Sequence, residues 1–435
     1  MSLRGLSPSR HDYSFVTRTS ARVDVAAGLS VAIVALPLAL AFGVSSGVGA
    51  QAGLVTAILA GALAAVFGGS HLQVSGPTGA MTVVLIPIYA QFGANAVFAV
   101  GIVAGIILVV ASLAGAAHSM RYIPLSVIEG FTLGIALLIG MQQVPLALGM
   151  KSDSSSVVMS AVHAIRDSRT SLHAQSLAIS LGTVLFIVIA RKIHASLPAG
   201  IIAVVLATLA TSVLHLDVKV VGTIPRSLSW VGFPSLSDLP WTSLFIPALS
   251  VAGLAAIEGL LCASVADSMA DVPAHNPHRE LLGQGIANLI VPLFGGVPAT
   301  AAIARTAVNV KAGATSRIAA ITHSLILLVC VLAAAGLVSH IPLASLAGVL
   351  LATAARMIDV PRLKEFVTRT THHGITITLT ALATLFLDLV EAVALGLVVA
   401  AMLSFLQSPR QHHQHEAEIG KAEDVLHDTF HEDGP

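Results

Sequence analysis

The stretch from Val25 through Met120 holds no Asp, Glu, Lys or Arg, and no other feature constrains this chain as much. A soluble domain would expose too much of this stretch to water. Over the whole chain, 55% of residues are hydrophobic and 10% are charged, with a mean hydropathy of +0.89. The formal net charge is zero, so the composition indicates no nucleic-acid partner. The sequence therefore predicts an all-α integral membrane protein in a lipid bilayer and excludes a soluble enzyme.

Apolar runs of spanning length predict about fourteen transmembrane segments. We place them at 24–46, 51–69, 78–92, 95–117, 122–148, 174–191, 198–215, 243–269, 279–293, 301–311, 317–338, 345–358, 373–388 and 390–408. The third and the tenth are too short to cross a bilayer alone, as expected of half-helices. An even number of spans puts both termini on one side. That side holds sixteen Lys and Arg residues against five on the other, which predicts cytoplasmic termini.

Two short segments, Gln73–Met81 and Gly295–Thr300 running on to Arg305, combine Gly, Pro and a hydroxyl residue within apolar surroundings. Such backbone is not an ordinary spanning helix, and at membrane depth it occurs only where protein buries it or where it lines a cavity. A matched pair, one in each half of the chain, indicates the central site of a transporter at an inverted-repeat interface. The positive ends of two half-helices would face each other there and attract an anion.

The sequence carries no cofactor motif and no metal site of recognisable spacing. Cys262 and Cys330 both lie in apolar runs, so neither a disulfide framework nor a CxxC site is expected. The histidine-rich tail, 409–435, is polar and mixed in charge, so we expect a disordered cytoplasmic segment. Metal binding by its run His412–His415 is the alternative.

Five stretches, in order and with matching spacing along residues 20–408, resemble the SulP (sulfate permease) family of anion transporters. They are Leu36–Phe42, Gln73–Met81, Ile257–Ser268, His275–Gly285 and Gly295–Asn309. The resemblance is to the bicarbonate-type branch and implies a multi-pass protein of the bacterial plasma (inner) membrane. Since about 27 residues follow the last predicted span, we expect a form that lacks the family's STAS domain. A homodimer is left open.

The resemblance further implies fourteen segments in a seven-plus-seven inverted repeat with two half-helices, a core domain that carries the substrate and a gate domain. Elevator-like movement of the core against the gate would transport the substrate. The expected divisions are an N-terminal cytoplasmic segment 1–23, core 24–118 (segments 1–4), gate 119–240 (segments 5–7), core 241–340 (segments 8–11), gate 341–408 (segments 12–14) and the tail 409–435.

The expected substrate-binding residues cluster at the two half-helix starts and beside them. They are Phe42, Thr78, Gly79, Ala80, Ala301, Ala302, Ile303 and Arg305. Helix starts offer backbone N–H groups without partners, and small residues allow close approach, although small residues also pack membrane helices tightly. The resemblance implies that Phe42 lines the pocket, with a lipid-facing or core position as the alternative. It also implies that Arg305 raises the potential near the anion. Pairing with a carboxylate, such as Glu258, is the other role open to it.

Glu258 lies in the middle of the eighth predicted span, and an ionisable group at this depth is a functional-site hypothesis by default. We expect it to couple proton and anion transport, the alternative being a protonated carboxyl that hydrogen-bonds across helices. The resemblance implies that sodium-coupled members of the family use an aspartate and, four positions on, a hydroxyl residue in the eighth segment, plus a threonine in the tenth. The matching positions here are Glu258, Cys262 and Ile303, and two of these lack an oxygen ligand. Sodium coupling is therefore not expected. Glu280 is expected to be solvated or to cap a helix.

The predicted function is secondary active transport of a small inorganic anion, with bicarbonate first and sulfate or a dicarboxylate next. Leu38 stands where sulfate-type relatives often carry glutamine, which favours a smaller and less polar pocket. Proton coupling or exchange is expected rather than sodium symport. The alternatives are a nucleobase:proton symporter of the same architecture, and an uncoupled anion channel or membrane partner of carbonic anhydrase.

Overall fold

The computed structural model describes residues 17–117, 125–150, 157–171, 173–194, 197–224, 227–228, 230–235, 239–358, 371–386, 395–396, 398–399 and 402. The chain divides into two compact units. The first comprises Met1–Tyr122, Ile135–Ile358 and Asp388–Val390, and the second Ile123–Gly134, Asp359–Leu387 and Glu391–Pro435. The predicted span 390–408 and the histidine-rich tail lie almost wholly outside the described residues, as does most of the predicted segment 1–23.

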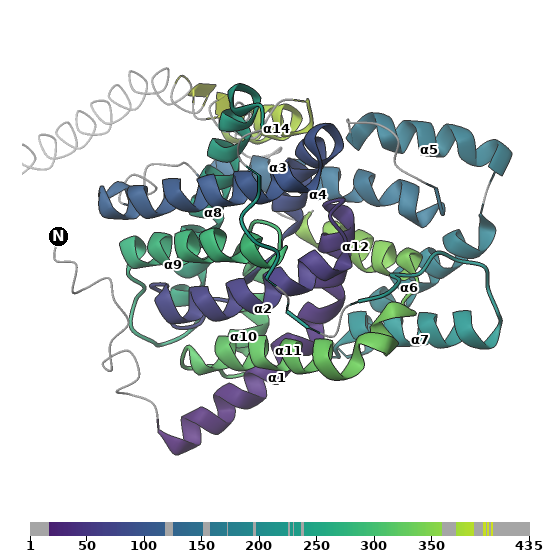
Figure 1. The fold of residues 1–435 in the computed structure, drawn as a ribbon, viewed down its shortest axis with the longest axis horizontal. Coiled ribbons are helices and arrows are strands. Elements are labelled where there is room, and N and C mark those ends of the chain that lie inside the picture. Colours follow the sequence, from purple (N-terminus) through teal and green to yellow (C-terminus); the bar gives the residue numbers. More distant parts are fainter. Residues whose placement is uncertain are drawn as a thin grey trace, which may run out of the picture. The chain divides into compact units, whose positions relative to one another are not determined.

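Helices make up nearly all of the regular structure in the described part of the chain (Figure 1). The first unit holds α1 (Arg18–Ser45), α2 (Ala50–Phe67), α3 (Gly79–Leu113), the larger part of α4 (Leu125–Ala147), α5 (Val157–Ser171), α6 (Ala174–Ile193), α7 (Ala199–Val213), α8 (Trp241–Met269), α9 (Pro277–Ile290), η4 (Val291–Phe294), α10 (Ile303–Lys311), α11 (Ile318–Ser339) and α12 (Leu343–Met357). The second unit holds the start of α4 and α14 (Thr371–Phe386). Each predicted span from 24–46 to 373–388 contains a helix, and α5 is a helix that the span prediction lacked.

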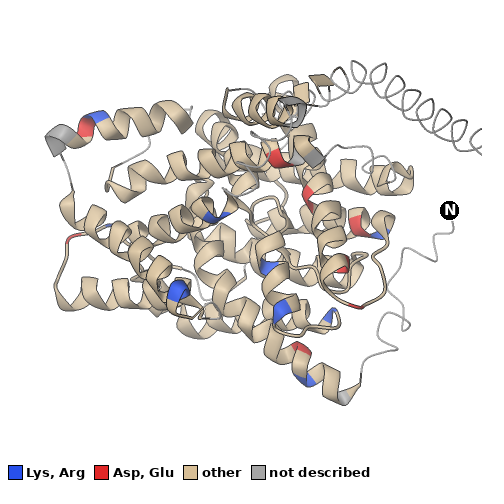
Figure 2. Cartoon of the chain, turned by 180° about the vertical axis from the view of Figure 1, so that it is seen from behind, with Lys and Arg blue, Asp and Glu red and all other residues tan. Residues whose placement is uncertain are grey.

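Seven helices among the described residues are long and apolar enough to cross a membrane. Shorter apolar helices occupy Ala199–Val213, Leu343–Met357 and Gly374–Phe386. Figure 2 shows long stretches of helix without a charged residue. The all-α membrane fold predicted from composition is therefore confirmed.

α3 is two helices joined at a sharp kink. Gly93 has φ 77° and ψ −175°, a conformation that glycine adopts and that other residues rarely do. The kink separates a first helix that starts at Gly79 from a second that ends at Leu113. This agrees with the predicted break between the half-helix 78–92 and the span 95–117.

The two broken segments pair with each other. β1 (Ser75–Gly76) and β2 (Thr300–Ala301) run antiparallel, with Ser75 opposite Ala301 and Gly76 opposite Thr300. α3 follows β1 and α10 follows β2 within a few residues. Because the strands are antiparallel, α3 and α10 run away from the paired strands in opposite directions. Their N-terminal ends therefore lie close to the same point.

The packing of the longer helices repeats between the two halves of the chain. α1 and α2 pack against α11, and in the same way α8 and α9 pack against α3. In the predicted span order, α11 and the second part of α3 are the fourth segments of the two repeats. This exchange between halves is the arrangement expected of an inverted repeat.

The chain after α2 is fixed by a buried carboxylate, contrary to the expectation that Glu280 is solvated or a cap. Glu280 is only 2% exposed. Its Oε2 accepts from the N–H groups of Gly69 and Ser70 at 2.9 and 3.0 Å, and its Oε1 accepts from Nε2 of Gln73 and Gln284 at 2.8 and 3.1 Å. The sequence places Glu280 near a connection between spans. In the structure, the backbone between α2 and β1 covers its carboxylate.

We expect Glu280→Ala to destabilise the protein by about 3 kcal/mol or more, because four buried donors would lose their acceptor. Thermal unfolding of the purified protein in detergent measures this as a fall in Tm. Asp271→Ala, at an exposed position in the same connection, is the matched control. Equal Tm values for the two variants would show that the Glu280 hydrogen bonds contribute nothing to stability.

Candidate functional site

Thr78 joins the start of α3 to α8. As the N-cap residue, its hydroxyl accepts a hydrogen bond from the N–H of Met81 at 3.3 Å. The same hydroxyl donates to Oε2 of Glu258 at 3.2 Å. A threonine is needed here because one group must both cap a helix and donate to a carboxyl group. The predicted residues Thr78 and Glu258 therefore lie in direct contact.

Phe42 packs at the start of α3 and is not lipid-facing, since it is only 7% exposed. A Cβ atom added at Gly79 would lie 3.2 Å from Cε1 of Phe42 and 2.2 Å from Cδ1 of Ile139. Only glycine fits between these two side chains without a shift. The structure thus brings a residue of α1 against the predicted half-helix start.

Both half-helices begin with N–H groups that have no acceptor in the described part of the chain. In α3 these belong to Gly79 and Ala80, and in α10 to Ile303 and the residue after it. Ala302 is the N-cap of α10 and makes no side-chain cap, while Ala301 lies in β2. Ile303 is 40% exposed, so this end of the site is open. Two helix N-termini together present donors and positive potential to one small volume.

Arg305 is the buried cation of this region, with 2% of its surface exposed. Its Nη2 donates to the carbonyl oxygen of Pro77 at 2.9 Å, while its Nη1 has no partner in the described residues. A Cβ atom at Gly76 would meet Nη1 at 2.5 Å, so glycine is required for the guanidinium to lie against β1. A side chain on α10 therefore places its charge at the start of α3.

Arg305 and Glu258 do not form a direct ion pair. His275 and Asp267, by contrast, form an ion pair at 2.7 Å. Arg305 acts on Glu258 electrostatically at longer range, and the hydroxyl of Thr300 also reaches the Glu258 carboxyl. Arg305 therefore keeps a donor free that a salt bridge would have used.

Cys262 is a fully buried packing residue. Its thiol donates to the hydroxyl of Thr306 at 3.2 Å, and that hydroxyl accepts from the N–H of Val74 at 3.0 Å. Neither Cys262 nor Ile303 supplies a carboxylate or hydroxyl oxygen. No group of three or more His, Cys, Asp or Glu side chains that could hold a metal occurs in the described part of the chain. Of the three positions that match the sodium ligands of relatives, only Glu258 therefore carries an oxygen ligand; Cys262 and Ile303 do not.

Polar side chains to which the sequence analysis gave no role at the site hold the broken segments in place. Nε2 of Gln284 donates to the hydroxyl of Ser75 at 2.7 Å. The Asn288 amide accepts from the N–H of Ala299 at 2.8 Å and donates to its carbonyl oxygen at 2.9 Å. The Thr56 hydroxyl bonds both backbone groups of Val297 in the same way. The polar residues Glu280, Gln284 and Asn288, four residues apart on one face of α9, were the available signal.

Buried His323 on α11 was also missed. Its side chain is 0% exposed, and neither ring nitrogen has a partner in the described residues. Arg305 acts on it electrostatically. A lone histidine within an apolar run was the only sign of it in the sequence.

Taken together, the geometry combines free N–H donors from two helices, one buried cation and one half-buried carboxyl. Backbone donors and a guanidinium suit an anion with oxygen acceptors. The carboxyl group can carry a proton without leaving its hydrogen bond to Thr78. This arrangement can bind an anion and a proton in the same small region, and it holds no nucleophile placed for catalysis.

Comparison with known proteins gives relatives along nearly the whole chain. The sequence model of the Sulfate permease family matches residues 22–381. The putative sulfate transporter YvdB of Bacillus subtilis is 33% identical over 422 residues, covering 95% of this chain and 79% of the relative. The bicarbonate transporter BicA of a Picosynechococcus species is 32% identical over 397 residues, covering 88% of this chain and 70% of the relative.

Solved structures show the same fold. The transmembrane domain of a cyanobacterial bicarbonate transporter, BicA, matches with a TM-score of 0.79 at 30% identity, covering 89% of this chain and 98% of that one. Murine Slc26a9, an anion transporter in the inward-facing state, matches with a TM-score of 0.83 and covers 93% of this chain and 72% of its own. Its identity is only 18%, so it supports the fold alone.

We expect Arg305→Ala to weaken binding of a small oxyanion about tenfold or more, because a desolvated anion loses its one nearby cation. Arg305→Lys should restore part of the affinity, since it keeps the charge but not the planar fork. Titration calorimetry on the purified protein measures both.

The matched control is Lys311→Ala, which removes an exposed cation from the same helix. An Arg305→Ala variant that binds with the parent affinity and unfolds at the parent Tm would reduce Arg305 to a structural role.

Proposed function

The chain belongs to the sulfate permease family, and on this premise we propose that it is a secondary active transporter of a small inorganic anion. Bicarbonate is the first candidate, and sulfate or a dicarboxylate comes next. The family is one of transporters and not of enzymes. Its members compared above are named for sulfate or bicarbonate transport, and the bicarbonate transporter's membrane domain matches nearly the full described fold.

The observation that carries this proposal is the free Nη1 donor of Arg305 beside two helix starts with unpaired N–H groups. A buried cation without a carboxylate partner is costly unless an anion neutralises it. A small anion fits because glycine and alanine line the helix starts. Leu38, on α1 one turn before Phe42, stands where sulfate-type relatives often carry glutamine, which supports bicarbonate over larger divalent anions.

Coupling to protons is the second part of the proposal. Glu258 contacts Thr78 at the helix start, so its proton and the proposed anion would bind next to each other. A proton on Glu258 would remove a negative charge that repels the anion. Symport or proton-linked exchange follows from this, whereas sodium lacks oxygen ligands at Cys262 and Ile303.

The transport movement is proposed to be elevator-like. The helices that carry the site residues, α1, α3, α8 and α10, contact one another. α6, α7 and α12 pack together and reach the site helices through α1. Rigid movement of the first group against the second would carry the anion across, with both termini in the cytoplasm of a bacterial cell. Dimer formation remains a separate proposal without a contact to support it.

A nucleobase:proton symporter is the second candidate of the same architecture. It is disfavoured by Arg305, because a neutral base does not require a buried cation. An uncoupled channel, or a membrane partner of carbonic anhydrase, would give anion flux that does not saturate or follow a pH gradient. Uptake of a labelled anion panel into proteoliposomes under imposed proton and sodium gradients separates these functions.

Glu258→Gln is expected to abolish proton-driven accumulation while leaving the fold intact, since glutamine keeps the hydrogen bond to Thr78 but cannot carry a proton. Uptake of labelled bicarbonate or sulfate into proteoliposomes with an inward proton gradient measures this. Glu258→Asp, which keeps an ionisable group, is the matched variant and should retain part of the accumulation.

Accumulation at the parent level in Glu258→Gln would remove Glu258 from the coupling mechanism. In the same assay, a sodium gradient at fixed pH and voltage should leave uptake by the parent protein unchanged. Several-fold stimulation by sodium would overturn the proposed coupling.

Ala80→Leu and Ala302→Leu should both block transport, because a backbone-bound anion needs its donors within about 3 Å and a leucine side chain would occupy that space. Ala80→Gly and Ala302→Gly are the controls and should remain active. Initial uptake rates are compared at equal protein content in the membrane. Normal transport by both leucine variants would place the anion away from the two helix starts.

A further inference from the structure

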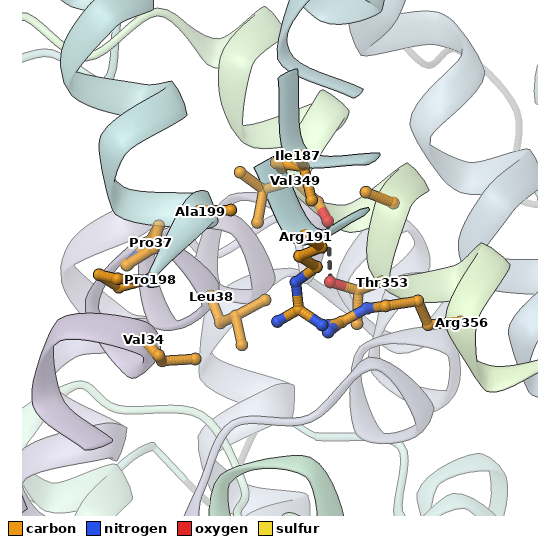
Figure 3. Close-up of a pocket in the computed structure, with 12 residues that line it drawn as sticks. Val34, Pro37, Leu38, Ile187, Arg191, Pro198, Ala199, Val349, Thr353 and Arg356 are labelled. Carbon is orange, nitrogen blue, oxygen red and sulfur yellow. Dashed lines mark hydrogen bonds between the residues drawn. The ribbon is translucent and has the colours of Figure 1, made fainter. Parts of the chain in front are cut away.

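A second anion-binding feature lies apart from the central site, in a cavity of about 30 Å³ between α1, α6, α7 and α12 (Figure 3). Val34, Pro37 and Leu38 of α1 form one wall of the cavity, and Val349 of α12 lies on another. A single buried water needs about 10–15 Å³ measured in this way. The cavity therefore has room for a small polyatomic ion and not for an organic molecule.

Two arginines reach into this cavity from different helices. Arg191 lies in the last turn of α6 and Arg356 in the last turn of α12. Figure 3 shows their guanidinium groups pointing toward each other, and the charge of Arg191 acts on Arg356. None of the residues that line the cavity is acidic, and neither arginine has an acidic partner in the described part of the chain. Arg191 is half-buried and Arg356 is exposed, so two like charges face each other in a cavity that is open on one side.

Helix dipoles do not account for this arrangement by themselves. A cation in the last turn of a helix is stabilised by the helix C-terminus, and this holds for each arginine separately. However, Nε of Arg191 is buried without any hydrogen-bond partner. The hydroxyl of Thr353, also in the cavity, donates to the carbonyl oxygen of Val349 at 2.8 Å. It does not accept a hydrogen bond from Nε of Arg191. A buried donor without an acceptor, next to a second cation, would be stabilised by an anion bound between them.

We propose that Arg191 and Arg356 form a second binding site for a small inorganic oxyanion at the boundary between α1 and the α6–α7–α12 group. Guanidinium groups bind planar or tetrahedral oxyanions through paired N–H donors. An anion held between them would cancel their repulsion and satisfy Nε of Arg191.

The position of the cavity on α1 gives this site its role, which rests on the function proposed above. Leu38 lines the cavity, and Phe42, one helical turn further on the same face, packs at the start of α3. Both arginines lie on the side of the membrane that the Lys/Arg distribution assigns to the cytoplasm. The site therefore holds an anion on the cytoplasmic approach to the central site and raises its local concentration there.

Transport kinetics test this role. In proteoliposomes, the double variant Arg191→Gln/Arg356→Gln should raise the anion concentration for half-maximal transport from the cytoplasmic side about tenfold. The maximal rate should stay within about twofold of the parent, because the central site is untouched. Arg191→Lys/Arg356→Lys should give an intermediate value, because lysine keeps the charge but lacks the Nε donor and the planar fork. Lys192→Gln, which removes an exposed charge beside Arg191, is the matched control and should change neither value.

A parent-like half-saturation value in the double glutamine variant would overturn the proposal, as would an equal effect of Lys192→Gln. Liposomes of phosphatidylcholine alone and with phosphatidylglycerol form two arms. An effect present in both supports a free anion, whereas an effect seen only with phosphatidylglycerol would assign the arginines to a lipid headgroup and overturn the free-anion site.

A binding measurement separates this proposal from the transport function. In an Arg305→Ala background, sodium sulfate or sodium bicarbonate should still raise Tm relative to sodium gluconate at equal ionic strength and pH, because ligand binding stabilises the folded state. Adding Arg191→Gln and Arg356→Gln should remove that rise. A rise without transport by the parent would refute the proposed function and keep the second site, and a rise that persists in the triple variant would refute the site.

Discussion

The structure depends on one constraint, that non-helical backbone inside a membrane must find hydrogen-bond partners within the protein. The chain interrupts two helices near the middle of the fold, and each interruption exposes N–H and C=O groups. β1 and β2 satisfy part of this need by pairing with each other. Side chains satisfy more of it, with Asn288 bonding both backbone groups of Ala299 and Thr56 bonding both of Val297. The polar residues in these helices are therefore structural supports for the site.

Some donors remain unpaired after this support. At the candidate site they are the N–H groups at the starts of α3 and α10 and Nη1 of Arg305. The carboxyl group of Glu258 is the neighbouring acceptor, held by Thr78. Free donors and a buried guanidinium at the two helix starts favour an anion. The family membership of the chain and this local chemistry lead to the same class of substrate.

The proposed second site extends the same logic to the boundary that an elevator movement would shift. α1 contributes to both locations, through Leu38 in the arginine cavity and Phe42 at the central site. A displacement of α1 against α6 and α12 would alter the cavity and the distance between the arginines and the apolar wall. Anion occupancy of the cavity is then linked to the conformation, because an anion can shift an equilibrium only by binding one state better than the other.

The sequence by itself determined the class of the protein and predicted where its site lies. The charge-free stretch Val25–Met120 required a membrane, and the Gly-Pro-hydroxyl segments before α3 and α10 marked the interruptions, because hydropathy and backbone freedom are properties of short stretches. The position of Glu258 in the middle of a span singled it out, and the family resemblance added the role of Arg305. The site residues themselves stay predictions until they are tested, although the structure does bring Phe42, Thr78, Glu258 and Arg305 to the start of α3.

The tertiary structure alone decided which distant residues meet. Glu280 was expected near solvent, but the fold closes Gly69 and Ser70 over its carboxylate. Arg305 was as consistent with a salt bridge as with a free cation, and only the fold directed it to the carbonyl of Pro77. Arg191 and Arg356 appear in the sequence as ordinary helix-end cations, and only the packing of α6 against α12 turns them toward each other. Partner choice depends on long-range packing, which no local pattern of residues encodes.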